Sequence, residues 1–510
     1  MSNSIKAAAV CAMLSVTACG EVATAPAGAT LALKACRVAG VDTEVKCATF
    51  EVIENRETRQ GRTIALNIVV LPAGARVKEP DPIFLFAGGP GQAAADLAPQ
   101  ALAILGGLNA KRDIVLIDQR GTGKSNFLTC KMPDVDQPGM SDLVKRDALT
   151  AKLIAKCRDQ LVQKADLTQY TTTIAMADYD EVRAALGYRQ INLWGGSYGT
   201  RSAMEYLRRY PQQVRTVTID GVAPPSMALP ITFSRDAGAV YEKMLAACEK
   251  EARCEKTFPG LKARVDRLLD TLAKQPRKTS VADSVTGMPR EIEVTRDMLL
   301  VSVFSTLYVP EMTALLPANL AAAEGGNFAP LLAQGALFGD FAEDKIAFGM
   351  RLSVACAEDI PRIAKADIER EAQRVPFGRV FIDEFAKACE GWPKGRMAAD
   401  FDQPVKSDKP VLILSGGLDP VTPPLHGDEV KRSLSNALHL VAPNVGHGVS
   451  VRGCAPKLVK KFIETASVAD LDGACLQRLP RPMFYEPLRD KKKDAAKPAL
   501  AEAITTGAAK

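Results

Sequence analysis

The segment from 191 to 209 constrains the fold of this chain more than any other. The run INLW from Ile191 to Trp194 is typical of a buried strand, GGSYG from Gly195 to Gly199 is a tight turn, and a helical pattern follows to Arg209. The glycines beside the serine remove Cβ atoms that would clash in a strand-to-helix turn. The pattern G-x-S-x-G between a strand and a helix predicts that Ser197 is an exposed nucleophile.

Further short apolar runs end at glycine-rich turns, as buried parallel strands do. They cover 64–71, 83–86, 114–117, 216–219, 411–414 and 438–441. Helical patterns such as 175–186 lie between them. This alternation predicts the α/β class, with a mostly parallel sheet and helices on both faces.

The alternation is interrupted between Pro225 and Pro410, where the pattern is mainly helical. We therefore expect an inserted helical cap at 228–404. It separates a first part of the core, 19–227, from a second part, 405–488. The tail, 489–510, is rich in Lys and Ala with little to bury, so we expect it to be disordered.

The N-terminus, 1–18, has the pattern of a cleaved signal peptide, with Lys6 followed by an apolar run from Ala7 to Val16 that is too short to span a bilayer. The next residues, Val-Thr-Ala-Cys19, resemble a bacterial lipobox, which makes Cys19 the candidate lipid anchor and the only expected membrane contact. The alternative is a plain secretory signal. Both predict export, to the periplasm or cell envelope as a lipoprotein or otherwise as a secreted protein.

The cysteines support export independently. Ten remain after Cys11 and Cys19 are set aside, and an even number in an exported chain predicts disulfides. The chain has only three histidines and no C-x-x-C, so we expect no metal site and no cofactor. We expect five sequential pairs: Cys36 with Cys47, Cys130 with Cys157, Cys248 with Cys254, Cys356 with Cys389, and Cys454 with Cys475.

Two classes of phosphate ligand are disfavoured. The 65 Lys and Arg residues against 59 Asp and Glu are spread along the chain, so we expect no nucleic-acid partner. The run from Gly121 to Ser125 ends like a phosphate-binding loop, but the required first glycine is replaced by Asp118. We interpret 118–125 as a structural turn in which Arg120 pairs with a buried carboxylate.

A serine hydroxyl needs a general base, and the three histidines make the search short. His447 lies in a polar glycine turn just past the last strand, whereas His426 follows two prolines and His439 lies inside an apolar strand run. His447 is therefore the predicted base, positioned at the carboxyl edge of the sheet.

The imidazole needs an orienting carboxylate, and Asp419 lies in the turn after the strand 411–414. Asp408 precedes that strand and Asp428 falls on an expected helix, so we favour Asp419. The oxyanion needs preorganised N–H donors, for which we expect the backbone of Tyr198 and of Gly89, the latter in the loop after the strand 83–86.

Together these segments resemble a known family. The matching motifs are AGGPG (87–91), DQRGTGKS (118–125), GGSYG (195–199), DPVTP (419–423) and GHG (446–448). The chain resembles, from about Cys47 to Cys475, the α/β-hydrolase serine peptidases that include prolyl aminopeptidases and secreted tripeptidyl aminopeptidases. Residues 355–359 and 389–393 resemble the C-terminal region of the tripeptidyl (TAP-like) type.

The resemblance implies an α/β-hydrolase fold and removal of residues from peptide N-termini through a Ser-Asp-His triad. Prolyl aminopeptidases carry His where this chain has Ala87, which weakens a proline-specific interpretation. Cap carboxylates bind the substrate amine in that family, and Glu358 and Asp359 are the candidates here, with a structural ion pair as the alternative. The substrate is then a peptide or a small acyl compound. A carboxylesterase or amidase and a non-catalytic envelope lipoprotein are the other hypotheses.

Overall fold

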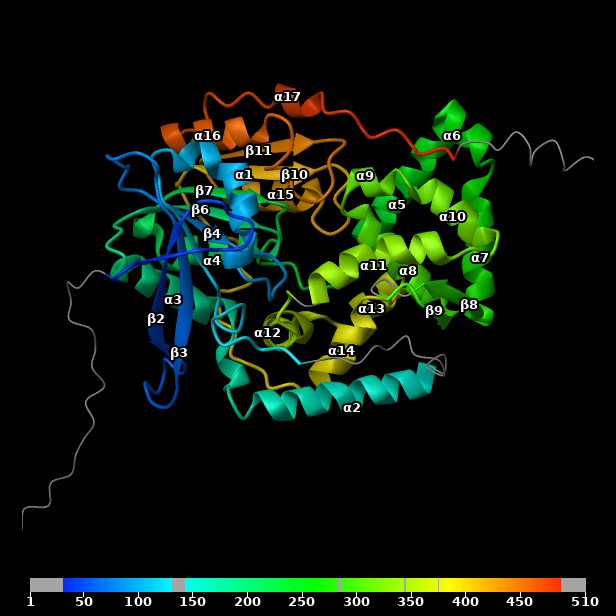
Figure 1. Ribbon diagram of the computed structural model, residues 1–510, viewed down its shortest axis with the longest axis horizontal. Coiled ribbons are helices and arrows are strands. Elements are labelled where there is room, and N and C mark those ends of the chain that lie inside the picture. Colours follow the sequence, from blue (N-terminus) through cyan, green and yellow to red (C-terminus); the bar gives the residue numbers. More distant parts are fainter. Residues whose placement is uncertain (1–30, 131–142, 283–285, 344, 375, 488–510) are drawn as a thin grey trace, which may run out of the picture.

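The computed structural model describes residues 31–130, 143–282, 286–343, 345–374 and 376–487. The predicted signal peptide, Cys19 and the tail beyond 488 lie outside these residues. The centre of the fold is a nine-stranded sheet in the order β1-β2-β3-β5-β4-β6-β7-β10-β11 (Figure 1). Its strands are β1 (Lys34–Cys36), β2 (Val45–Ile53), β3 (Thr63–Leu71), β4 (Ile83–Phe86), β5 (Ile114–Ile117), β6 (Ile191–Gly196), β7 (Val214–Asp220), β10 (Val411–Gly416) and β11 (Ala437–Ala442).

The sheet is parallel from β5 to β11 and antiparallel from β1 to β3. The α/β class and the mostly parallel sheet are therefore confirmed. One strand was assigned the wrong direction, because β3 runs antiparallel to both β2 and β5. A continuous apolar run indicates that a strand is buried on both faces. An antiparallel strand in the middle of a sheet is buried in the same way as a parallel one, so the run does not show the strand's direction.

Helices cover both faces of the sheet. On one face α1 (Ala98–Asn109) and α16 (Ala455–Thr465) pack together, burying Leu105 and Phe462 with the strands. On the other face α3 (Thr172–Ala185) and α4 (Tyr198–Arg209) pack against β4, β6 and β7. The remaining helices of this part are η1 (Ala95–Leu97), α2 (Leu143–Leu161), η2 (Leu167–Gln169), η3 (Pro211–Gln213), α15 (Pro424–Lys431) and α17 (Ala474–Gln477).

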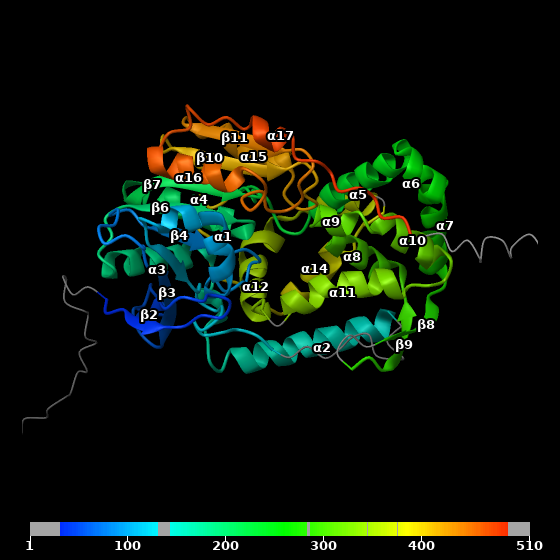
Figure 2. The same ribbon diagram turned by 45° about the horizontal axis from the view of Figure 1, so that its top comes forward.

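The chain between β7 and β10 is mainly helical and lies beside the sheet (Figure 2). It contains one antiparallel hairpin, β8 (Arg277–Ala282) with β9 (Pro289–Val294). We keep 228–404 as the proposed limits of the cap. Its helices are α5 (Phe233–Lys250), α6 (Ala252–Thr257), α7 (Leu261–Lys274), α8 (Arg296–Leu307), α9 (Pro310–Thr313), α10 (Leu316–Glu324), α11 (Ala329–Glu343), α12 (Phe348–Val354), the π-helix η4 (Ala355–Asp359), η5 (Ile360–Arg362), α13 (Lys365–Ala372) and α14 (Ile382–Glu390).

Apolar packing divides this inserted chain into two parts. The first, from α5 to α11, has its own core around residues such as Leu300 and Leu320. The second, from α12 to the segment just after α14, buries Met350 and Trp392 in the core that lies under α3 and α4, while its Phe377 joins the first core. The second part therefore packs on the sheet's helices, and both views show α2 extending beneath it (Figures 1 and 2).

Five disulfides join the cysteines in the same sequential pairs that were expected. Their S–S distances are 1.93 to 2.02 Å: Cys36–Cys47, Cys130–Cys157, Cys248–Cys254, Cys356–Cys389 and Cys454–Cys475. Among the described helices, none is both long and apolar enough to cross a membrane.

Candidate active site

Ser197 occupies a strained position between β6 and α4. Its φ of 56° and ψ of −126° are rare for a residue with a side chain, and strain of this kind concentrates at functional sites. Its backbone N–H donates to Asp220 O at 2.9 Å, which ties the turn to the end of β7. Ser197 is partly exposed, whereas Trp194 and Tyr198 on either side are buried.

The two outer glycines of the motif are required by close backbone approaches. A Cβ on Gly195 would lie 2.3 Å from Gly199 O, and one on Gly199 would lie 2.0 Å from Phe86 O. Both distances are far below van der Waals contact, so any larger residue would force the turn open. The spacing of the motif thus fixes the geometry that holds Ser197 outward.

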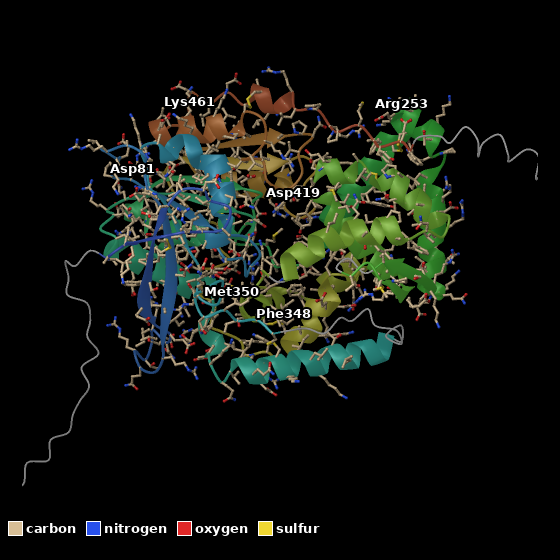
Figure 3. The ribbon with its side chains drawn as sticks, in the orientation of Figure 1. Asp81, Arg253, Phe348, Met350, Asp419 and Lys461 are labelled. Atoms are coloured by element: carbon tan, nitrogen blue, oxygen red, sulfur yellow. A yellow bond between two sulfur atoms is a disulfide. The ribbon has the colours of Figure 1, made fainter. Side chains whose placement is uncertain are left out.

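Asp419 and His447 are in direct contact, and Figure 3 shows Asp419 where the sheet meets the inserted helices. His447 Nδ1 lies 2.8 Å from Asp419 Oδ2. Asp419 is fully buried and also accepts the N–H groups of Val421 and Thr422 at 2.9 and 2.8 Å and the Thr422 hydroxyl at 2.7 Å. With Nδ1 directed at the carboxylate, Nε2 of His447 is left to act as a base.

Burial and charge oppose each other in this pair. Burial favours the neutral form of each group, but the charge and hydrogen bond of the partner outweigh it. As a result the pKa of His447 is raised above 6.5, and the pKa of Asp419 is lowered below 3.8 by His447 and Thr422. The carboxylate is therefore ionised whenever the imidazole is able to accept a proton.

Asp220 and Gly221, at the end of β7, were not found from the sequence. The Asp220 carboxylate accepts the N–H groups of Val449 and Ser450 at 2.9 and 2.7 Å, so it holds the loop that follows His447. A Cβ on Gly221, whose φ is +67°, would lie 3.0 Å from His447 Cε1. This dipeptide therefore brings the Ser197 turn and the His447 loop together. In the sequence, the feature that could have identified it is its position directly after the apolar run 216–219.

The two expected oxyanion donors flank the serine. The N–H of Tyr198 is in the first turn of α4, where no carbonyl of the helix can accept it. Gly89 lies in the loop after β4 with φ +108°, and a Cβ on its neighbour Gly88 would be 3.3 Å from Ser197 Cβ. Gly88 N–H donates to the side chain of Gln92 at 3.3 Å, which leaves the next amide, that of Gly89, as the candidate from this loop.

The inserted chain contacts both the His447 loop and the Gly89 loop. His447 N–H donates to Tyr308 O at 3.0 Å, and the two rings meet edge to face with centroids 5.3 Å apart. Ala347 N–H donates to Gly91 O at 2.9 Å, beside the candidate oxyanion loop. The position of the inserted chain is therefore coupled to His447 and to the Gly89 loop.

Glu358 and Asp359, the candidates for binding a substrate amine, have partners inside the protein. Both Glu358 oxygens accept from Thr172, its N–H at 2.5 Å and its hydroxyl at 2.8 Å. Asp359 Oδ1 accepts from Arg201 at 2.9 Å and from Leu229 N–H at 3.0 Å. Both side chains are buried, so this arrangement favours the structural alternative over an exposed amine site.

The other two histidines bond to carboxylates elsewhere. His426 Nε2 lies 2.9 Å from Asp236 Oδ2, which links α15 to α5. His439 lies 2.9 Å from Ser415 Oγ and 2.8 Å from Asp428 Oδ1. This second Ser-His-Asp arrangement has a fully buried serine inside β10, so no substrate could reach its hydroxyl.

The turn 118–125 has the structural role that was expected of it. Arg120 is fully buried and pairs with Asp178 through two bonds of 2.6 and 2.8 Å. Asp118 accepts the N–H groups of Ala95 and Lys124 at 2.9 and 3.1 Å. Among the described residues, no group of three or more His, Cys, Asp or Glu side chains is placed to hold a metal ion.

Comparison with known proteins gives two family matches. Residues 81–247 match the alpha/beta hydrolase fold family, and residues 373–475 match the family described as TAP-like protein. The first covers the Gly89 loop and Ser197, and the second covers Asp419 and His447. Both matches agree with the family that the sequence motifs resemble.

Individual proteins are similar to this chain over different lengths. The chain is 23% identical over 462 residues to serine protease Hip1 of Mycobacterium tuberculosis, covering 82% of this chain and 84% of the relative. It is 32% identical over 123 residues to tripeptidyl aminopeptidase of Streptomyces lividans, covering 22% of each. Among solved structures, proline iminopeptidase of Mycobacterium smegmatis aligns with a TM-score of 0.36 and 14% identity, covering 83% of this chain and 99% of that one.

Proposed function

Because this chain is a serine hydrolase of the α/β-hydrolase fold and of the peptidase type, we propose that it is an exported aminopeptidase that uses Ser197, His447 and Asp419 as its catalytic triad. The observation that carries the proposal is the contact between His447 Nδ1 and the buried Asp419 carboxylate, which the end of β7 joins to the strained turn of Ser197. The relative named tripeptidyl aminopeptidase supports the aminopeptidase type.

The proposed reaction has two stages. His447 Nε2 takes the Ser197 proton as Oγ attacks the peptide carbonyl, and Asp419 stabilises the imidazolium that forms. The amides of Tyr198 and Gly89 stabilise the oxyanion. The C–N bond then breaks as His447 gives its proton to the leaving amine. Water, deprotonated by His447, attacks the acyl-enzyme and releases the second product.

An esterase or amidase is the second candidate, and one observation favours it. Glu358 and Asp359 are buried and bonded to Thr172, Arg201 and Leu229, so neither carboxylate is presented to a substrate amine. Binding of the free amine by this pair stays a prediction. Without such a site, a triad alone does not select peptides over esters.

Export of this chain is supported by its disulfides. Five bridges in one chain are typical of proteins that fold outside the cytoplasm, where thiols are not kept reduced. The signal pattern of 1–18 adds independent support. We propose attachment to the cell envelope through Cys19.

The experiment that tests the proposal uses purified mature protein and a matched panel. The panel contains mono-, di- and tripeptide anilides, the same compounds with a blocked N-terminus, and short-chain nitrophenyl esters. We expect cleavage of anilides with a free amine and a large loss of kcat/KM when the amine is blocked. Equal cleavage of blocked and free compounds, with faster ester hydrolysis, would identify the esterase alternative.

A further inference from the structure

A buried chain of hydrogen bonds runs from the π-helix η4 to the residue that follows the nucleophile. Both oxygens of Glu358 accept from Thr172, and the Thr172 hydroxyl lies 2.6 Å from the Tyr198 hydroxyl. Gln119 Nε2 lies 3.3 Å from the same phenol. All four side chains are at most 7% exposed. The network therefore ends on the residue whose N–H is the proposed oxyanion donor.

The contact between Glu358 and Thr172 is anchored on both sides. Thr172 is the first residue of α3, so its N–H has no helical acceptor and the helix dipole favours the Glu358 carboxylate there. On the other side, Cys356, two residues before Glu358, is bridged to Cys389 of α14. Thr172 therefore cannot move without disturbing the start of α3, and Glu358 cannot move without disturbing the segment held by the disulfide.

The donors in this network have a defined order when Glu358 is ionised. A carboxylate only accepts, so the Thr172 hydroxyl donates to Glu358 and its oxygen accepts from the Tyr198 hydroxyl. Gln119 Nε2 can only donate, so it requires the phenol oxygen to accept. Tyr198 thus has one hydrogen-bonded orientation, with its proton directed at Thr172.

The surroundings of Glu358 permit a change of its charge near neutral pH. Burial raises the pKa of Glu358 to about 7, although Arg201 and the bonds from Thr172 act in the opposite direction. The other titratable groups around it are Tyr198 on α4, Asp359 on η4 itself and, on η5, Arg362, whose Nε donates to Glu358 O at 2.6 Å. A protonated Glu358 can donate to the Thr172 hydroxyl. The Thr172 and Tyr198 hydroxyls are then no longer restricted to one donor–acceptor arrangement.

We propose that Glu358 and Thr172 are positioning residues for the reaction, which hold the Tyr198 phenol in one orientation and thereby fix its backbone N–H toward the oxyanion. This inference rests on the proposed function, because it requires Tyr198 N–H to be an oxyanion donor. In this proposal Glu358 acts on the oxyanion donor through Thr172 and Tyr198, and it does not contact a substrate amine.

The first test replaces Thr172 by Val, which keeps the shape and removes the hydroxyl that joins Tyr198 to Glu358. We expect kcat on the best substrate of the panel to fall by about 10- to 100-fold with KM within about twofold, because a displaced oxyanion donor affects the transition state alone. Binding of a peptide aldehyde, which forms a tetrahedral adduct, weakens by the same factor, whereas binding of the released peptide product does not change. Thr172→Ser restores most of kcat.

Thr216→Val is the matched control. Thr216 is fully buried in β7 and donates its hydroxyl to Asn192 Oδ1 at 2.7 Å, at the end of β6 remote from Ser197. This variant loses a comparable buried hydrogen bond and is expected to keep wild-type kcat. If both valine variants lose kcat equally, the effect of Thr172 is general destabilisation and the inference fails.

Glu358→Gln gives a second, independent measurement. The amide must place its NH₂ against either the N–H or the hydroxyl of Thr172, which breaks the donor order. In the wild type we expect log kcat/KM to fall at acid pH with a slope above one, because His447 and Glu358 both gain protons. In Glu358→Gln the slope is one and the maximum is lower. An unchanged maximum and slope would overturn the inference even if Thr172→Val does not fold.

The outcome also separates this inference from the proposed function. If Ser197→Ala keeps the activity of the wild type, the proposed function fails. If Ser197→Ala is inactive while folded Thr172→Val and Glu358→Gln keep wild-type kcat, only the positioning role fails. Where turnover is too slow to measure, the rate of fluorophosphonate labelling at Ser197 replaces kcat.

Discussion

At the scale of single residues, the site depends on a serine that is held in an unfavourable backbone conformation by its neighbours. The glycines at 195 and 199 allow backbone contacts that no side chain would permit, and Asp220 O accepts the Ser197 N–H. The same turn starts α4 at Tyr198, whose N–H has no acceptor within the helix and lies beside the proposed nucleophile. The strained backbone, the proposed nucleophile and the proposed oxyanion donor therefore occupy two adjacent residues.

The first prediction concerns the nucleophile. Ser197→Ala removes the only atom that can form the acyl-enzyme, so we expect turnover to fall by about 10⁶-fold, the size of the loss in a comparable serine protease, with no change in thermal unfolding. Ser415→Ala is the control, since Ser415 also bonds to a histidine but is fully buried. Full activity of Ser197→Ala, or loss of activity in a folded Ser415→Ala, would contradict the assignment.

The second prediction concerns pH. The neutral imidazole of His447 is the active form and its pKa is raised, so kcat/KM falls as the pH drops through a value above 6.5. Asp419→Asn removes the charge that raises this pKa while burial still lowers it, so the acid limb moves to lower pH. We also expect kcat to fall by about 10⁴-fold, as for the equivalent change in a triad protease. An acid limb that stays in place would exclude Asp419 as the partner of His447.

At the scale of secondary-structure elements, the sequence predicted strand bounds best where every residue of the strand is apolar and buried. The bounds of β4 and β5 were predicted without error because all their residues are apolar and buried. The strand β2 was missed, since VKCATFEVI mixes exposed and buried residues and lacks a continuous apolar run. The direction of β3 was wrong because burial does not report strand direction.

Long-range contacts set the limit for the site residues as well. Ser197, Asp419 and His447 were predicted from local motifs and chain order. The partner of Glu358, Thr172, is 186 positions away in the sequence, and no local pattern joins the two. The same holds for Asp220, which looks like the polar end of a strand until the loop after His447 folds onto it.

The third prediction concerns the disulfides as links between elements. Cys356–Cys389 closes a loop of 33 residues and joins η4 to α14, whereas Cys248–Cys254 closes a loop of only 6. Loop-closure entropy predicts a loss of about 4 kcal/mol for the first bridge and about 2 kcal/mol for the second. Urea unfolding of the two double-serine variants measures both. Equal losses would show that chain entropy does not set their contributions.

At the scale of the whole molecule, the inserted chain and the sheet meet at the proposed active site. The inserted chain contributes Tyr308, which packs on His447, and Ala347, which bonds to the Gly89 loop. Its second part also brings Glu358 to the base of α3 and α4. The insertion therefore contacts the loops of the proposed active site as well as lying beside the sheet.

The fourth prediction concerns the location of the molecule. If Cys19 is the lipid anchor, the protein expressed in a bacterial host fractionates with membranes and its N-terminal peptide carries the mass of a lipid-modified cysteine. Cys19→Ala then releases it in soluble form, since a lipid chain is the only membrane contact expected. A mature protein that is soluble with Cys19 intact and unmodified would establish plain secretion.

We propose that one serine, Ser197, is the nucleophile of this hydrolase. The position of a covalent label on the protein identifies the nucleophile most directly. The mature protein is treated with a fluorophosphonate and the adduct is located by peptide mass spectrometry. We expect one adduct per folded chain on Ser197, none on Ser415, and no labelling after denaturation or in Ser197→Ala. An adduct on another residue, or a folded protein that is not labelled, would contradict it.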